Sequence, residues 1–229
     1  MVGEVYVSSS QQGSSWVPEI KPRLRGVSHQ WAFFAALVLG AVLVVSAPSR
    51  RALAAAAIYA VALVGMFGAS ALYHRIDWRP RVNVWMRRLD HSMIFVMIAG
   101  TYTPIALLLL DGAFSRIVLG VLWGGAILGL VMNLVWIGAP SWLAALVYVV
   151  LGWIGLATLP QLVRGGGVVA ATLLVAGGIL YTAGAVVYAR RRPDPKPAVF
   201  GYHEVFHVFV IAAATVHFVA LAFFVVPQG

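Results

Sequence analysis

The chain has 229 residues, of which 62% are hydrophobic and only 10% are charged, and its net charge is +9. Soluble globular domains carry roughly 45–50% apolar and about 25% charged residues, so this composition excludes a soluble protein and predicts an integral membrane protein. The length accommodates about seven helices of roughly 20 residues joined by short loops. Cysteine is absent from the sequence, which excludes disulfides and thiolate metal sites and leaves His, Asp, Glu or water as metal ligands.

The first 26 residues are polar, rich in Ser and Gln, and end with the basic residues Lys21, Arg23 and Arg25. These basic residues come late, and no small-residue cleavage site follows a short apolar core, so the pattern does not match a cleaved signal peptide. We expect residues 1–26 to form a flexible cytoplasmic tail. Residues 27–229 are expected to form one membrane domain.

Seven apolar runs follow the tail and predict an all-α fold, a seven-transmembrane helix bundle. The breaks between them are polar or rich in Pro and Gly; the longest is Arg75–Arg88, and the glycine run 165–167 is expected to be a turn. The predicted spans cover residues 28–47, 53–74, 89–110, 115–137, 142–162, 168–189 and 203–226.

The distribution of basic residues predicts the orientation of the bundle. With the N-terminus inside, twelve of the sixteen Lys and Arg residues fall in cytoplasmic segments and four in outer loops. Cytoplasmic loops carry the excess of positive charge in membrane proteins, so we expect a cytoplasmic N-terminus and an outer C-terminus. The basic loops also predict contacts with anionic lipid head groups. No basic stripe with interleaved aromatic residues indicates nucleic-acid binding.

This orientation brings several unusual residues to the cytoplasmic level. His74 ends the second span, Asp90 begins the third, and His203 and His207 begin the seventh. Ser70 lies one turn from His74 on the same helix face. Residues four apart also share a face, so His203 and His207 are spaced to bind one ion. Three imidazoles with a fourth position left for water predict a catalytic zinc site.

The chemistry expected from such a site is hydrolysis of an amide or ester at the cytoplasmic membrane surface. Zinc lowers the pKa of its bound water to about 7. Asp90 is expected to accept the proton of that water or to orient it, and Ser70 to donate a hydrogen bond to a carbonyl or a developing oxyanion. Simpler interpretations stay open: Asp90 follows Arg87 and Arg88 at a helix start, and a membrane-helix serine is often a small packing residue.

The sequence predicts less strongly that the remaining histidines, His29, His91 and His217, belong to the metal site. His29 lies beside Trp31 and is interpreted as an interfacial residue. His91 is about 100° around the helix from Asp90 and need not face the same side. His217 lies ten residues beyond His207, about 15 Å deeper, where we expect a buried hydrogen-bonding role.

A protease interpretation competes for the same residues. His203-Glu204-Val205-Phe206-His207 spells H-E-x-x-H, in which Glu204 would be the general base. Intramembrane proteases of this kind add a distant aspartate, and Leu110-Asp111-Gly112 offers one. Asp111, however, is predicted at the outer end of the third span, about 30 Å from the histidines, which disfavours a protease.

Three ordered motifs carry a resemblance to a known family. They are Ser70-Ala-Leu-Tyr-His74, Arg88-Leu-Asp90-His-Ser running on to Gly100-Thr-Tyr-Thr-Pro104, and His203-Glu-Val-Phe-His207 followed by Val216-His217-Phe218. Over residues 28–226 the chain resembles the hemolysin III family, bacterial relatives of the progestin and adipoQ receptors in a superfamily that includes alkaline ceramidases. His91 stands where adiponectin receptors carry tyrosine.

The resemblance implies a cell-membrane protein with zinc held by His74, His203 and His207. It implies water between the zinc and Asp90, with Ser70 close by. Eukaryotic relatives resemble lipid amidases that act on ceramide. Where relatives carry glutamine at the position of Glu204, no base is required there, which favours Asp90.

Three functions remain in competition at this point. The first is a zinc-dependent hydrolase of a lipid amide or ester, with membrane lipids as substrate. The second is a non-catalytic sensor or regulator of lipid homeostasis in which zinc is a structural pin. The third, a pore-forming cytolysin, is disfavoured because seven apolar spans do not suit a toxin that must cross water.

Overall fold

The computed structural model describes residues 21–136 and 141–229, and within these ranges it is helical and contains no β-strand. The predicted all-α class is confirmed. The α-helices are α1 (Val27–Val45), α2 (Arg50–Arg75), α3 (Pro80–Leu108), α4 (Gly112–Val135), α5 (Ser141–Ile154), α6 (Leu159–Arg190) and α7 (Tyr202–Ala220). A 3-10 turn, η1 (Gly155–Thr158), joins α5 to α6, and α7 continues through η2 (Leu221–Val225) and η3 (Val226–Gln228).

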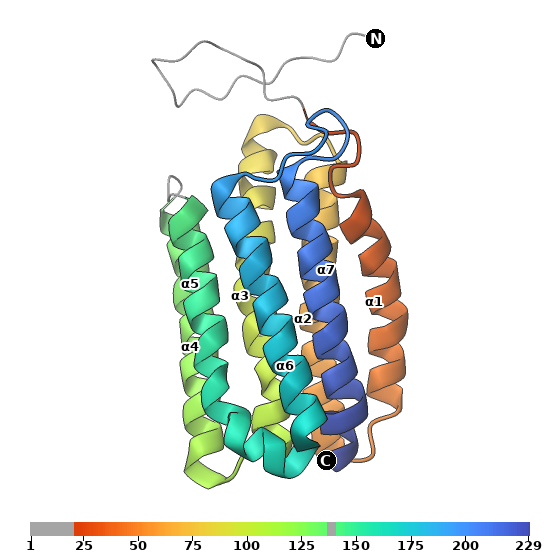
Figure 1. The fold of residues 1–229 in the computed structure, drawn as a ribbon, viewed down its shortest axis with the longest axis vertical. Helices are drawn as coiled ribbons and strands as arrows, with labels where there is room; N and C mark the ends of the chain where they lie inside the picture. Colours follow the sequence, from red (N-terminus) through yellow and green to blue (C-terminus); the bar gives the residue numbers. More distant parts are fainter. Residues whose placement is uncertain (1–20, 137–140) are drawn as a thin grey trace.

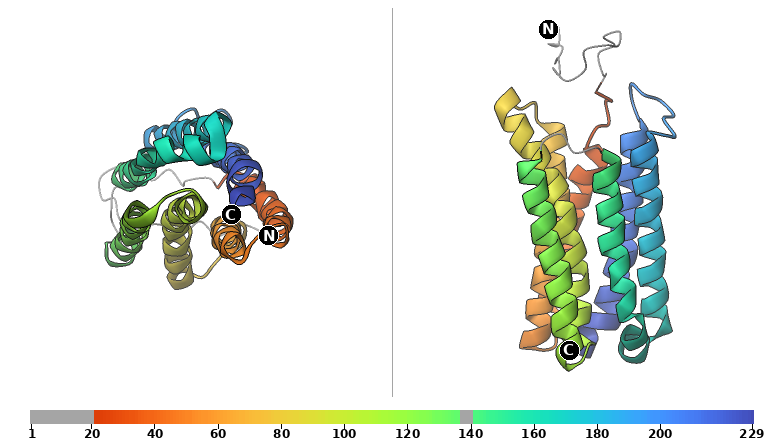
Figure 2. Two further views of the ribbon diagram at one scale, coloured as in Figure 1. Left: turned by 90° about the horizontal axis from the view of Figure 1, so that it is seen from below. Right: turned by 90° about the vertical axis from the view of Figure 1, so that its left-hand side faces the viewer.

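The helices run along the long axis of an elongated bundle (Figure 1). Seen along that axis, they follow one another around a ring, and α7 returns beside α1 (Figure 2). The most extensive contacts join α6 to α7, α2 to α3 and α1 to α2. The end of α2 and the starts of α1, α3 and α7 therefore meet at one end of the bundle, and the C-terminus lies at the other end (Figure 1).

Six segments of the described chain are long and apolar enough to cross a membrane. The longest, Ala145–Arg190, has 46 residues and includes most of α5 together with η1 and α6. Within it, α5 and α6 lie side by side (Figure 1), and Gly167 leaves the helical conformation with φ 83° and ψ 168°. The prediction of a helical membrane protein with several apolar spans is confirmed.

One helix boundary differs from that expected, and one predicted break is present as a kink. Helix α3 begins at Pro80, well before the predicted residue 89, because a proline at the first helical position has its φ preset and needs no N–H partner. The predicted turn at residues 165–167 coincides with a kink at Gly167, which separates two helical stretches within α6. Residues 1–20 of the predicted tail and the predicted break at residues 137–140 lie outside the described residues.

Small residues bring α1, α2 and α3 close together. A Cβ added at Gly100 on α3 would lie 2.5 Å from the Cβ of Ala62 on α2, so the crossing of these two helices depends on that glycine. Membrane helices commonly pack through small residues because apolar side chains gain little by leaving lipid for protein. Large apolar side chains such as Val45 and Leu128 are instead exposed on the outer surface. This packing holds the ends of α2 and α3 at the level where α7 begins.

Candidate metal centre

Three histidines meet where the last turn of α2 approaches the first turns of α7. His74, His203 and His207 are all buried, and each offers a ring nitrogen within 4.8 Å of the nitrogens of the others. The Nε2 atoms of His74 and His203 are 3.1 Å apart. We call these three residues the histidine cluster. The structure thus brings together the three residues that the sequence predicted as metal ligands.

One pair of nitrogens in the histidine cluster has the spacing of two ligands on a tetrahedral metal ion. With Zn–N bonds of about 2.0–2.1 Å, two ligand nitrogens are about 3.3 Å apart, close to the separation of His74 and His203. Nδ1 of His207 is buried and has no hydrogen-bond partner among the described residues. A buried imidazole nitrogen without a partner is costly unless it binds a metal or water. Three neutral imidazoles suit Zn²⁺ and related divalent transition metals.

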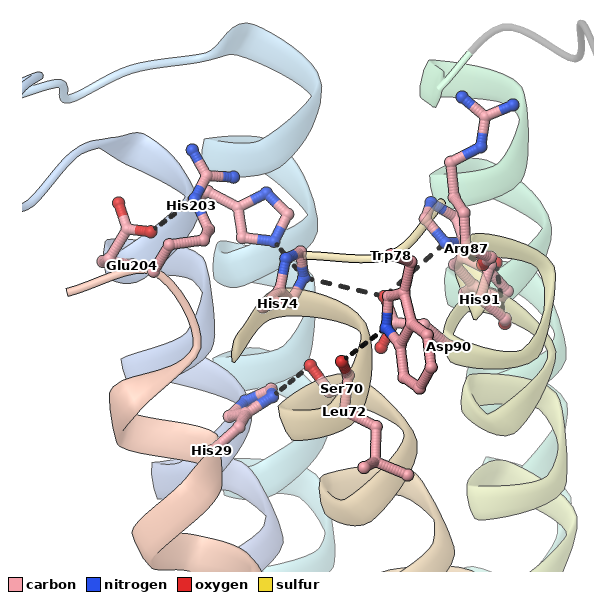
Figure 3. Close-up of polar contacts among 12 residues, drawn as sticks. His29, Ser70, Leu72, His74, Trp78, Arg87, Asp90, His91, His203 and Glu204 are labelled. Atoms are coloured by element: carbon pink, nitrogen blue, oxygen red, sulfur yellow. Dashed lines mark hydrogen bonds and ion pairs between the residues drawn. The ribbon is translucent and has the colours of Figure 1, made fainter. Parts of the chain in front are cut away.

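Asp90, near the start of α3, lies beside the histidine cluster. Its Oδ2 atom is 3.8 Å from Nε2 of His74, which is too long for a hydrogen bond. The side chain is 15% exposed, so it is partly shielded from solvent. Asp90 also interacts with the hydroxyl of Ser70. The predicted base and the predicted hydroxyl therefore lie next to the same ligand (Figure 3).

His91 lies on the side of Asp90 away from the histidine cluster (Figure 3). Its Nδ1–H donates to the carbonyl of Arg87 at 2.8 Å and lies 3.6 Å from Oδ2 of Asp90. The backbone carbonyl of His91 accepts a hydrogen bond from Tyr148 at 3.1 Å. His91 therefore contacts Asp90 from the side opposite the histidine cluster. This placement agrees with the expectation that His91 and Asp90 need not face the same side.

The interpretation of His29 as an interfacial residue is wrong. His29 is 3% exposed and reaches inward from α1, where its Nδ1 lies 2.8 Å from Oγ of Ser70. Its ring stacks on that of His207, with centroids 3.7 Å apart and planes within 10°. The missed signal was the spacing of the buried α1 residues, since Ala36, Gly40 and Leu43 recur at helical intervals from His29 and mark the inner face.

Glu204 does not face the histidine cluster, although it belongs to the H-E-x-x-H pattern. One carboxylate oxygen accepts the backbone N–H of Gly201 at 2.8 Å, and the other lies 2.8 Å from Nε of Arg25. The side chain caps the start of α7 and points away from His74 (Figure 3). Asp111 lies just before α4, about 30 Å along α3 from Asp90. The geometry therefore does not assemble the protease arrangement.

The segment from Lys21 to Gly26, here called the strap, crosses the same end of the bundle. Its backbone N–H groups at Arg23 and Leu24 each donate to carbonyls of the loop before α7, those of Ala198 and Val199, at 3.1 Å. Gly26 has φ 76°, and a Cβ added there would lie 2.5 Å from the Cβ of His74. The strap backbone therefore packs directly on a candidate ligand and covers it from that side.

An apolar cavity begins below the histidine cluster and continues toward the middle of the bundle. It has about 880 Å³ of empty space, part of which is open to the outside, and is lined by residues of α2, α3, α5, α6, η1 and α7. Phe206 lines it and also touches the rings of His203 and His207, with centroids 5.9 and 5.7 Å away. Ile94, one turn from Asp90, lines it as well. Phe206 thus lies between the cavity lining and the rings of two candidate ligands.

The polar groups in the cavity wall are largely engaged by protein. Thr101 donates to the carbonyl of Met97, Tyr102 to that of Gly152, and Thr182 to that of Gly178. His217 donates from Nε2 to the carbonyl of Leu174 at 3.0 Å. That contact agrees with the buried hydrogen-bonding role expected for His217. The Tyr181 hydroxyl and Nδ1 of His217 have no partner among the described residues, but most of the lining is apolar, so the cavity suits a largely apolar occupant.

Comparison with known proteins agrees with the motifs. The family profile described as "Haemolysin-III related" matches residues 18–218. The chain is 29% identical to Hemolysin-3 of Bacillus cereus over 181 residues, 79% of this chain and 80% of that relative. It is also 29% identical to a Hemolysin-3 homolog of Bacillus subtilis (strain 168) over 169 residues, 74% of this chain and 76% of that relative.

Six segments of the described residues can cross a membrane, and the protein is a multi-pass protein of the cell membrane. The resemblance drawn from the three motifs is confirmed at the level of this family, and the relation to receptors and ceramidases lies at the level of the superfamily. The chain belongs to the haemolysin-III related family.

Proposed function

We propose that this protein is a zinc-dependent hydrolase of a lipid amide or ester. The observation that carries the proposal is the convergence of the histidine cluster with Asp90, whose carboxylate lies 3.8 Å from a candidate ligand nitrogen. Zinc held by His74, His203 and His207 supplies a Lewis acid that polarises a carbonyl and acidifies bound water. A purely interfacial set of polar residues would have no reason to converge in this way.

Asp90 is the proposed general base. It is close enough to the histidine cluster to take a proton through one water, and the Glu204 carboxylate is already engaged by Gly201 and Arg25. Ser70 has one hydroxyl proton and two acceptor sites, so it can accept from His29 and donate toward Asp90 or a substrate carbonyl. The strap limits the access of bulk water from above the site, which strengthens the electrostatic interactions below it.

The cavity supports a lipid as the substrate. A hydrocarbon chain placed in it would run along the inside of the bundle from Phe206 toward His217, a path of about 16 Å along α7. The head of such a lipid would lie at the histidine cluster, where the amide or ester bond must be. Peptide substrates fit less well, since a peptide backbone would leave N–H and C=O groups unpaired against an apolar wall.

Seven crossings and a cytoplasmic N-terminus are part of this proposal. The side-by-side placement of α5 and α6 supports two crossings within the 46-residue segment Ala145–Arg190 (Figure 1). The arginines at the end of α2, the start of α3 and the end of α6 all lie at the level of the histidine cluster, and this supports a cytoplasmic site. Membrane lipids are the proposed substrate, and anionic head groups are proposed to contact these arginines.

The test is the Asp90→Asn variant, purified in full length and loaded with zinc. We expect zinc per chain to stay at the wild-type value, while hydrolysis of a fluorescent long-chain lipid amide falls by about 10²- to 10⁴-fold. Asp77→Asn is the matched control, because it removes an aspartate charge at the same end from an exposed position paired with Lys21. Turnover by Asp90→Asn at the wild-type rate would overturn the assignment of Asp90.

A structural role for zinc is the second candidate, and the depth of the site favours it. His207 is 1% exposed, and the histidine cluster ties α2 to α7. In that case, removal of zinc would lower the unfolding temperature, and zinc-loaded wild type would hydrolyse none of a panel of lipid amides and esters. Robust zinc-dependent turnover would reject the purely structural role.

A further inference from the structure

His29 on α1 is buried and contacts the candidate metal centre through Ser70 and His207. It is not within the group of nitrogens that converge on a metal, so it is not a ligand. Its ring is held on three sides by Ser70, His207 and Phe67. A histidine placed at this depth against a ligand calls for an explanation, since polar groups inside membrane proteins are costly and usually functional.

The hydrogen bond to Ser70 fixes the ring of His29 in its plane. Nδ1 of His29 and Oγ of Ser70 are 2.8 Å apart in a buried environment. Because Ser70 also interacts with the acceptor-only carboxylate of Asp90, its hydroxyl proton is best directed there, and its oxygen then accepts from Nδ1–H of His29. The edge of His29 also meets the ring of Phe67 at a centroid distance of 5.1 Å. Rotation of the imidazole would break both contacts.

The stacking contact with His29 also restricts the orientation of the His207 ring. The two rings lie face to face with centroids 3.7 Å apart and an interplanar angle of 10°. Among the described residues neither ring nitrogen of His207 has a hydrogen-bond partner, so the nitrogen turned away from a bound metal would lack the carboxylate or carbonyl that usually orients a metal-bound histidine. A neighbouring ring that blocks rotation about the last side-chain bond can do the same work by packing.

We propose that His29 is a positioning residue of the metal centre: Ser70 anchors its ring, and its ring holds the plane of the ligand His207. This inference rests on the metal part of the proposed function and does not depend on hydrolysis. It assigns α1 a part in a site whose ligands come from α2 and α7, and it gives Ser70 a second role besides its interaction with Asp90.

Binding of Co²⁺ to purified full-length protein tests the inference, because the visible spectrum of Co²⁺ reports its ligand geometry as well as its affinity. His29→Ala removes the anchor and the ring, whereas His29→Phe keeps a ring against His207 and loses the anchor. Ser70→Ala removes the anchor and, with it, the interaction of the hydroxyl with Asp90. Leu43→Ala is the control, since Leu43 is a buried α1 residue about 21 Å along the helix from His29.

We expect His29→Ala to weaken Co²⁺ binding by about 10- to 100-fold, the usual cost of losing an outer partner of a metal ligand, and to change the spectrum. His29→Phe and Ser70→Ala should each lose less. The double variant His29→Phe/Ser70→Ala should bind no more weakly than Ser70→Ala alone, because Ser70→Ala has already removed the anchor that His29→Phe removes. Leu43→Ala should bind like the wild type.

Three results would overturn the inference. Wild-type affinity and spectrum in His29→Ala would overturn the whole of it while leaving the metal site intact. Additive losses in the double variant would overturn the link from Ser70 through His29. A wild type that binds no Co²⁺ and no Zn²⁺ would overturn the proposed function, and this inference with it, so the two failures are distinguishable.

Discussion

Helix α7 carries buried histidines at two depths, and the two regions differ in what surrounds them. At its start, His203 and His207 converge with His74 from α2 and are flanked by His29 and Asp90. Ten residues further along, His217 is equally buried at 5% exposure. Burial of a histidine in a membrane helix is therefore not by itself a sign of a metal site.

The deeper region has a different chemistry. His217 donates one hydrogen bond to the carbonyl of Leu174, and its ring fills the space left by Gly177 on α6. Its other close ring contact is Tyr181, at a centroid distance of 5.5 Å. The hydrogen bond from His217 to the carbonyl of Leu174 joins α7 to α6. The three histidines of the histidine cluster, which come from α2 and α7 and lie near a carboxylate, could instead hold an ion. The two regions therefore differ in whether ring nitrogens from several histidines converge, as they do only in the histidine cluster among these two regions.

The largest expected effect is on metal affinity. His207→Ala should weaken zinc binding by more than about 100-fold, beyond the 10–100-fold loss typical of outer partners, because it removes a ligand itself. His217→Leu should leave the affinity within about threefold of wild type, since a deep interhelical hydrogen bond is typically worth only about 0.6 kcal/mol. Chelator competition and elemental analysis measure both. Equal losses of zinc affinity in the two variants would contradict the difference drawn between the two histidine regions of α7.

The next effect concerns packing in the deeper region. A Cβ at Gly177 would lie 2.2 Å from the ring of His217, so Gly177→Ala should reduce the free energy of unfolding by about 1–3 kcal/mol. Gly124→Ala on α4 is the control, because nothing lies within 4 Å of its added Cβ. Thermal unfolding in detergent measures both variants. If His217 is the obstacle, His217→Ala should remove most of the penalty; an unchanged penalty would count against this contact.

Glu204→Gln tests the carboxylate beside the histidine cluster. The amide oxygen of Gln can still accept from Gly201, but the charge that faces Arg25 is lost, so we expect a cost of about 1–2 kcal/mol in unfolding free energy. Zinc affinity and lipid turnover should stay within a few-fold of wild type. A loss of turnover as large as that of Asp90→Asn would instead make Glu204 the base and revive the H-E-x-x-H interpretation.

The smallest effect is expected at the strap, where Lys21 and Asp77 form an exposed ion pair of 2.8 Å. The hydrogen bond and charge of Lys21 hold the pKa of the Asp77 carboxyl below its ordinary value. Such a carboxylate stabilises the fold above its unfolded pKa, and the stabilisation is lost as the pH falls through its lowered pKa. Exposure and salt limit the effect, so Asp77→Asn should cost less than about 0.5 kcal/mol.

Unfolding temperatures of Asp77→Asn and wild type, recorded against pH at low and high salt, check this. The two proteins should differ slightly at neutral pH in low salt and converge in acid or in high salt. A difference that grows in acid would show that the Lys21–Asp77 pair is not its source.

Much of the site could be predicted from local features of the sequence. Composition identified a membrane protein, and helical spacing placed His203 and His207 on one face. The count of basic residues predicted that His74 and Asp90 lie at the same membrane level as His203 and His207. In the structure both lie beside these two histidines. These predictions succeed because a span in lipid must be helical and of nearly fixed length, so that depth in the membrane follows from position in the chain.

The tertiary structure decided which way each helix faces its neighbours. His29 looked interfacial from its flanking tryptophan, yet α1 turns it inward onto Ser70 and His207. The H-E-x-x-H motif suggested that Glu204 is a base, yet in the structure Glu204 caps the start of α7 at Gly201 and pairs with Arg25 of the strap. Sequence spacing sets the depth of a side chain along one helix, whereas rotation of that helix about its axis depends on packing against residues far away in the chain.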